Sequence, residues 1–227
     1  MSLQCIDRFR PALRQQQQKV IDAGQLRLND EFEALAPQHL RPLALLSLYL
    51  LLGGLLFFAL LNLIAYPRGQ HPPLHLTPGI VFLIILLNIM GYVLILPIHE
   101  VIHALAFLFW GGRPYFGAKL PLALFCGARE QLFPRNYYLS IGLAPVIVIS
   151  LAGCILTCWR PDLAFYTLLA VAGNLSGAAG DLWAVRRLLL QPANVLVEDT
   201  DAGYRAWIVS QSTGVSQVAD ANAHQKE

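Results

Sequence analysis

The sequence is poor in charged residues. Asp, Glu, Lys and Arg make up only 13% of its 227 residues, whereas 56% are hydrophobic and the mean hydropathy is +0.53. Soluble domains contain about 25% charged residues, so this composition excludes an ordinary soluble protein and indicates a membrane protein. The net charge of only +2 gives no evidence for binding to nucleic acid.

Paired cysteines and a signal peptide are also absent. The four cysteines, Cys5, Cys126, Cys154 and Cys158, lack the paired spacing of a zinc knuckle, and we interpret them as small apolar residues. The first forty residues contain no charged start followed by a short apolar core and a cleavage site of small residues. We therefore expect no cleaved signal peptide, and the first apolar segment should remain in the protein.

Long apolar segments fill most of the chain instead. Each is long enough to cross a bilayer, which takes about 20 helical residues, and they cover residues 43–65, 79–110, 137–159 and 163–190. The second segment is too long for one straight span, and Pro97 is expected to kink or break it. The sequence therefore allows two arrangements of this segment: one bent crossing, or a crossing followed by a re-entrant helix.

Polar regions flank this apolar core. Residues 1–42 are expected to form a cytosolic extension, mostly a solvated tail, with a short amphipathic helix that Asn29 caps and that runs through Phe32 and Leu35. Residues 191–227 predict a cytosolic β-hairpin and a polar tail. The predicted fold is an all-α integral membrane protein with about four transmembrane helices, a kinked motif helix and a small C-terminal hairpin. Its three regions are 1–42, 43–190 and 191–227.

Basic residues predict the orientation in the membrane. They precede the first apolar segment, occupy the loop at 111–136 and lie at the end of the fourth segment, whereas the loop at 66–77 contains only Arg68. By the positive-inside rule, both termini and the 111–136 loop are cytosolic, in a multi-pass protein of the cell membrane. Within that loop, residues 115–120 and 122–126 fit either two short strands or an ordinary connection.

An H-E-x-x-H motif lies in the second apolar segment. On a helix, His99 and His103 stand one turn apart on the same face, where both imidazoles can bind one metal ion. Glu100 lies at the flank where a metal-bound water would sit. Ionisable side chains are costly in a membrane unless they are paired, bind a metal or face water. The motif therefore predicts a zinc hydrolase, with Glu100 as the base that activates the water.

Asp181 is the predicted third zinc ligand. It is the one acid of the apolar segments besides Glu100, and the topology places it at the same depth as the motif. A helix-terminal acid near Arg186 and Arg187 is the alternative interpretation of Asp181. Other acids that fit a third ligand are Glu130 and Asp199, whereas His71 and His75 fall on the opposite side of the membrane. Asn174, two turns before Asp181, is predicted to bind substrate, to support a metal ligand or to link two helices.

A family resemblance rests on four stretches. HEVIHALAF at 99–107, the GAK segment, LAP at 143–145 and NLSGAAGDL at 174–182 resemble the bacterial membrane zincin peptidases, which are similar to the site-2 intramembrane metalloproteases. The resemblance implies Zn²⁺ on His99, His103 and Asp181, Glu100 as base, the bacterial inner membrane as location, and a membrane or juxtamembrane protein as substrate. A non-catalytic scaffold that retains a structural metal site is the alternative, and a zinc or proton transporter is a third.

Overall fold

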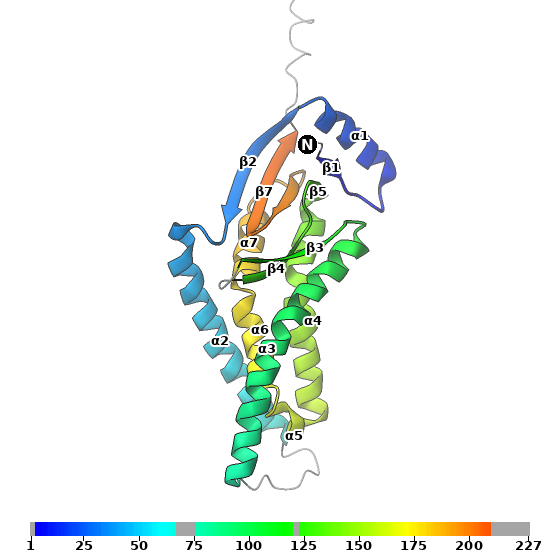
Figure 1. Ribbon diagram of the computed structural model, residues 1–227. Coiled ribbons are helices and arrows are strands. Elements are labelled where there is room, and N and C mark those ends of the chain that lie inside the picture. Colours follow the sequence, from blue (N-terminus) through cyan, green and yellow to red (C-terminus); the bar gives the residue numbers. More distant parts are fainter. Residues whose placement is uncertain (1–2, 67–75, 120–122, 210–227) are drawn as a thin grey trace, which may run out of the picture.

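The computed structural model describes residues 3–66, 76–119 and 123–209. A helical bundle forms one end of the molecule and a β-sheet the other (Figure 1). The helices of the bundle are α2 (Pro37–Ala65), α3 (Pro78–Phe109), α4 (Arg135–Trp159), α5 (Pro161–Ala164), α6 (Leu168–Gly177) and α7 (Ala179–Leu189). The described residues are thus mostly helical, but they also form two sheets, which the predicted all-α class did not include. The sequence predicted one C-terminal hairpin and left strands at 115–120 and 122–126 as an alternative.

Three helices, α2, α3 and α4, are long and apolar enough to cross a membrane. They turn large apolar side chains outward, including Leu63 on α2, Phe82 on α3 and Leu151 on α4. Leucine-rich surfaces of this kind have no favourable partner in water, whereas lipid acyl chains match them. Helices α6 and α7 are long and apolar enough to cross a membrane only when they are taken together, and the chain bends by 43° between them.

Pro97 lies inside α3 and does not divide it. Of the two alternatives that the sequence left open, a kink or a break at Pro97, the break is wrong, and α3 is one helix of 32 residues. Proline removes a single backbone hydrogen bond and tends to bend a helix rather than end it when packing holds both sides. Asn88 before the proline and His99 and Phe107 after it are all buried, so both parts of α3 pack against the bundle.

The larger sheet joins segments from both ends of the chain. Its strands, in spatial order, are β1 (Gln4–Cys5), β5 (Gln131–Pro134), β6 (Leu196–Thr200), β7 (Gly203–Val209) and β2 (Leu26–Glu33). Strands β6 and β7 form the predicted C-terminal hairpin. Phe32, Val197 and Tyr204 pack with Leu188 of α7 in a buried core that attaches the sheet to the bundle.

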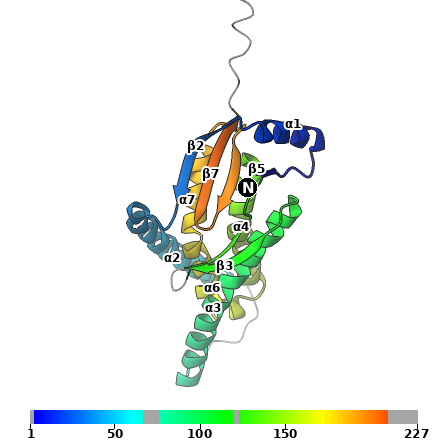
Figure 2. The same cartoon turned by 45° about the horizontal axis from the view of Figure 1, so that its top comes forward.

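Residues 1–42 differ from their prediction. Residues 26–33 form strand β2 and not the short helix capped by Asn29, because β2 pairs antiparallel with β7 from Leu26 to Glu33, with a register shift at Asn29. Those backbone bonds come from the far end of the chain, so local capping signals could not reveal them. Residues 11–22, expected in a solvated tail, form helix α1 (Pro11–Asp22), which lies beside the sheet and has no fully buried residue (Figure 2).

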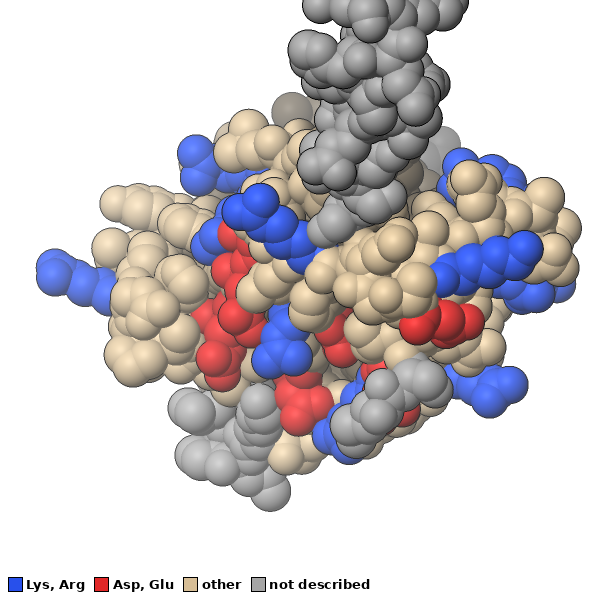
Figure 3. Space-filling model, turned by 90° about the horizontal axis from the view of Figure 1, so that it is seen from above, with Lys and Arg blue, Asp and Glu red and all other residues tan. Residues whose placement is uncertain are grey.

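Charged side chains gather at the sheet end of the molecule. Seen from above, this end shows Lys and Arg side chains near the rim and Asp and Glu side chains between them (Figure 3). A small hairpin of β3 (Tyr115–Lys119) and β4 (Ala123–Gly127) lies between this polar end and the helices (Figure 1). It occupies the loop for which strands were one of two interpretations.

Candidate metal centre

The buried face of α3 carries both motif histidines. His99 and His103 are 7% and 6% exposed, and their Nε2 atoms lie 3.1 Å apart. A spacing of four residues places them one above the other, as the helical repeat requires. The structure therefore brings the two motif histidines together as predicted.

Asp181 reaches the same point from the first turn of α7. Its Oδ2 lies 3.1 Å from Nε2 of His99 and 3.5 Å from Nε2 of His103. Asp181 follows directly after the 43° bend between α6 and α7. One ligand atom from each of the three residues lies within 4.8 Å of the others, so they form a possible metal site.

The second ring nitrogen of each histidine has its own partner. Nδ1 of His99 lies 2.8 Å from Oδ1 of Asn174, and Nδ1 of His103 lies 3.0 Å from the carbonyl oxygen of Ile141. Both partners are acceptors, so both Nδ1 atoms must carry the proton and donate. The Nε2 atoms then present lone pairs toward each other and toward the carboxylate of Asp181.

Pro145 explains why the Ile141 carbonyl can accept from His103. In a regular helix that carbonyl would accept the N–H of residue 145, but proline has no N–H. The carbonyl of Pro145 in turn accepts Nδ2 of Asn174 at 3.4 Å. The missing N–H four residues after Ile141 is the signal in the sequence that could have revealed this role of Pro145.

The geometry fits a zinc ion. Two neutral imidazole lone pairs and a carboxylate oxygen that face one another repel unless a cation lies between them. For metal–ligand distances of about 2.0–2.1 Å, the ligand atoms of a tetrahedral site lie about 3.3–3.4 Å apart. The three separations of 3.1, 3.1 and 3.5 Å are close to that value. The hydrogen bonds to Nδ1 are the supporting contacts that zinc-binding histidines have in proteins.

Glu100 lies beside the three ligands and is held by the small hairpin. Its Oε2 accepts the backbone N–H of Cys126 in β4 at 2.6 Å. Glu100, His99, His103 and Asp181 all line one cavity of about 540 Å³, which the sheet end closes with Asp199 to Gly203. The contact with the Cys126 amide could not be predicted, because it depends on how the hairpin folds back over α3.

Two other ionisable groups of this cavity have raised pKa values. Burial raises the pKa of the Cys126 thiol to about 12, so it is protonated and not a nucleophile near neutral pH. Burial also raises the pKa of Asp199 to about 7, although the Tyr138 hydroxyl and the Ala128 N–H donate to its carboxylate at 2.6 and 2.9 Å. The Asp199 carboxylate therefore points toward Tyr138 of α4 and Ala128 of the β4–β5 turn, and its hydrogen bonds are not with the histidines.

The remaining candidates for a third ligand do not join the site. Glu130 has a left-handed backbone with φ of 59° and does not line the cavity of the histidines. His71 and His75 lie outside the described residues. Of the acids that the sequence offered, Asp181 is thus the one that meets His99 and His103.

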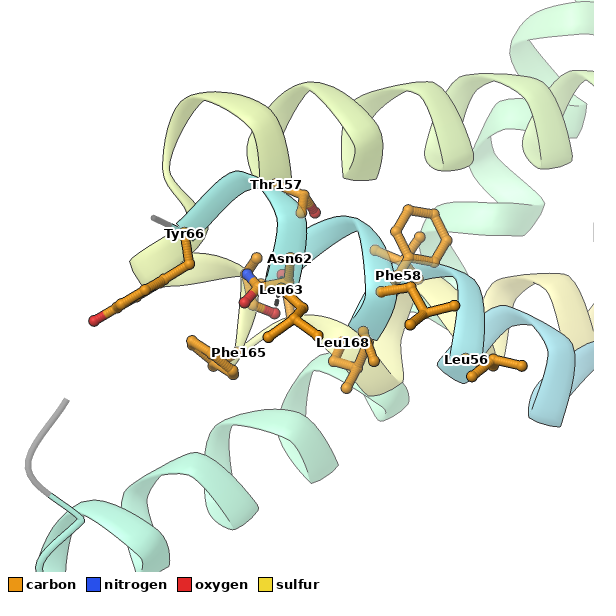
Figure 4. A pocket seen from close by; sticks show the side chains of 13 residues that line it. Leu56, Phe58, Asn62, Leu63, Tyr66, Thr157, Phe165 and Leu168 are labelled. Carbon is orange, nitrogen blue, oxygen red and sulfur yellow. Dashed lines mark hydrogen bonds between the residues drawn. The ribbon is translucent and has the colours of Figure 1, made fainter. Parts of the chain in front are cut away.

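A second cavity, of about 360 Å³, lies at the opposite end of the bundle (Figure 4). Its lining is apolar apart from a few groups, and those include Asn62 and Thr157, which bond to the carbonyls of Pro161 and Gly153. Among the described residues that line it there is no histidine, cysteine or carboxylate. It therefore lacks the groups that metal-dependent hydrolysis requires.

Comparison with known families agrees with this geometry. Residues 92–196 match the model of a family described as "Putative zincin peptidase". The matched zincin region includes His99, Glu100, His103 and Asp181, and it supports a metallopeptidase with zinc as the metal. The strands β2 and β7 lie outside it. Searches of curated proteins and of solved structures returned no match.

Proposed function

We propose that the protein is a membrane-embedded zinc peptidase that hydrolyses a peptide bond of a membrane or juxtamembrane protein near the cytosolic face. The observation that carries this proposal is the convergence of His99, His103 and Asp181 on one point, with Glu100 in the same cavity. Three protein ligands leave the fourth position of a tetrahedral zinc open, as catalytic sites require.

The chain provides the groups for hydrolysis. A bound zinc ion would polarise the substrate carbonyl and increase the acidity of water. Glu100 takes a proton from the attacking water, whose oxygen bonds to the carbonyl carbon, and delivers a proton to the nitrogen as the C–N bond breaks. The products are a carboxylate and an amine. Since the Cys126 amide engages Oε2 of Glu100, we assign Oε1 to the water.

Asn174 takes a supporting role in this proposal. Its side chain is 1% exposed, and it contacts His99 and Pro145. We therefore assign it to the orientation of His99 rather than to direct contact with substrate, which was one of the sequence-based predictions.

The bundle supports a location in the membrane. The apolar outward faces of α2, α3 and α4 match lipid, and the sheet end with its charged surface fits the cytosol. The metal cluster lies in the part of α3 that approaches the sheet end, so cleavage would take place close to the cytosolic boundary. The substrate is then a membrane protein, or a segment next to a membrane span.

Zinc content is the first test. Purified protein should contain about one zinc ion per chain, and His103→Ala should contain almost none. His39→Ala is the matched control, because His39 bonds to the Glu33 carbonyl outside the cluster. Equal and negligible zinc in wild type and His103→Ala would refute the metal centre.

Glu100→Gln separates a peptidase from a scaffold. Because Glu100 is not one of the three ligands, the variant should keep its zinc and lose peptide hydrolysis by about 100-fold or more. It should also retain bound substrate, which can be captured by crosslinking in membranes. A variant that keeps both zinc and the full cellular activity would favour the non-catalytic scaffold.

A further inference from the structure

Gly177 faces open space next to the metal cluster. It lies at the end of α6, three residues after Asn174 and four before Asp181, and both of these residues contact His99. A Cβ atom added at Gly177 would have nothing within 4 Å, and Gly177 lines the 540 Å³ cavity. A side chain of a bound peptide could therefore occupy the space that residue 177 leaves empty.

Neighbouring residues limit this opening on two sides. A Cβ at Gly173, one turn earlier, would lie 2.3 Å from the ring of Tyr92, so that ring covers the position. A Cβ at Gly180 would be 4.0 Å from Cβ of Ala34, which precedes α2. The opening above Gly177 is thus limited by Tyr92 on the side of Gly173 and by Ala34 on the side of Gly180.

Several residues of the cavity that Gly177 lines are apolar or aromatic. Tyr92, Ile95 and Leu96 of α3 line the cavity on one side and Leu35 on another. Apolar walls favour aliphatic and aromatic side chains, because their removal from water contributes about 25 cal/mol per Å² of buried area. Gly177 lies within four residues of both Asn174 and Asp181, so a side chain that reaches it belongs to a residue close to the bond at the metal.

We propose that Gly177 forms the base of an apolar subsite that binds one bulky aliphatic or aromatic side chain of the substrate, next to the scissile peptide bond. This inference rests on the proposed peptidase function and adds the substrate class. Peptides with glycine or a charged residue at that place should be poor substrates.

Thiol labelling tests the opening without any turnover. In a background with the four native cysteines replaced by serine, Gly177→Cys should react with a membrane-impermeant maleimide. Gly53→Cys is the matched control: Gly53 is also exposed and helical with nothing within 4 Å of an added Cβ, but it lies on the outward face of α2. It should not react in a bilayer. Equal labelling of the two variants, or none at Gly177→Cys, would overturn the subsite.

Protection of the same thiol tests which side chain binds. A peptide hydroxamate with leucine next to its zinc-binding group should slow the labelling of zinc-loaded Gly177→Cys at least tenfold, and the glycine analogue should not. Equal protection by both compounds would show that no apolar side chain reaches Gly177.

Cleavage specificity provides a further test of the subsite, after labelling and protection. Zinc-loaded protein in detergent is incubated with a synthetic dodecapeptide library, and the cleaved bonds are identified by mass spectrometry. Gly177→Leu should fill the subsite and shift the preference from bulky to small residues by at least tenfold, since a few methylene groups in a pocket are worth about that much. Gly53→Leu should keep the wild-type preference, and both variants should keep their zinc.

Two failures can be distinguished. If wild-type protein cleaves no library peptide, the peptidase function fails, and the subsite with it. If wild type cleaves but Gly177→Leu has the wild-type preference, only the subsite is refuted.

Discussion

Replacing Asn174 by alanine should weaken zinc binding without removing a ligand. The Asn174 side chain is 1% exposed, and its Oδ1 accepts Nδ1–H of His99 at 2.8 Å. Without this acceptor, a buried N–H loses its partner, at a cost of about 1–3 kcal/mol. The His99 ring also becomes free to rotate away from the metal. Loss of such a supporting contact typically reduces metal affinity by about 10–100-fold, or about 1.4–2.8 kcal/mol.

Asn88→Ala is the matched control for this prediction. Asn88 is also a buried helical asparagine, and it bonds to the carbonyls of Ile84 and Phe165 and to the N–H of Leu169. It lies eleven residues before His99, which is about 16 Å along α3. Asn88→Ala should therefore lower the thermal stability and leave the zinc dissociation constant within about twofold of wild type.

Competition against a fluorescent zinc chelator in detergent measures both dissociation constants, and thermal unfolding of the zinc-free proteins measures stability. The zinc dissociation constants of the two variants should differ, whereas their thermal stabilities should be lowered to a similar extent. Unchanged zinc affinity in Asn174→Ala, or an equal loss in Asn88→Ala, would refute the supporting role of Asn174.

Three further predictions follow from single contacts. Pro145→Ala restores an N–H that competes with His103 for the Ile141 carbonyl, so zinc affinity should fall by about threefold to tenfold in the chelator assay. In the folded zinc-free protein Asp199 keeps its proton up to a pH of about 7, whereas an aspartate in the unfolded chain has already lost its proton above about pH 4. The free energy of unfolding should therefore fall between pH 4 and pH 7, by up to about 1.4 kcal/mol per pH unit, and it should fall less steeply in Asp199→Asn. Gly203→Ala would place a Cβ 1.9 Å from the backbone oxygen of Phe32, so it should destabilise the β2–β7 pair by about 2 kcal/mol or more in thermal unfolding, and a stability equal to wild type would contradict the pairing.

The candidate metal centre was largely predictable because its signals are local. The spacing of His99 and His103 places two imidazoles on one helical face, whatever surrounds the helix. Asp181 could be selected because ionisable residues are rare in the apolar segments. The supporting groups were harder to predict. The Ile141 carbonyl and the Cys126 amide belong to the backbone, and every residue offers such groups, so only the packing of α4 and β4 selects these two.

In the fold, too, elements that depend on neighbouring residues could be predicted, and elements that depend on distant residues could not. The three long helices follow from continuous apolar runs, and the β6–β7 hairpin follows from two strand-like runs around a turn. Strand β2 could not be found in this way. Residues 26–33 have polar positions typical of a helix start, and their extended conformation depends on pairing with β7.

The sequence by itself determined the apolar helices, the pair of histidines and the scarcity of other ionisable groups, because periodicity and composition act over a few neighbouring residues. Only the tertiary structure decided that α3 continues through Pro97, that Asp181 meets both Nε2 atoms, and that the space above Gly177 remains open. These features depend on contacts between helices that are distant in the chain, and the strength of such contacts is set by the packing of whole side chains.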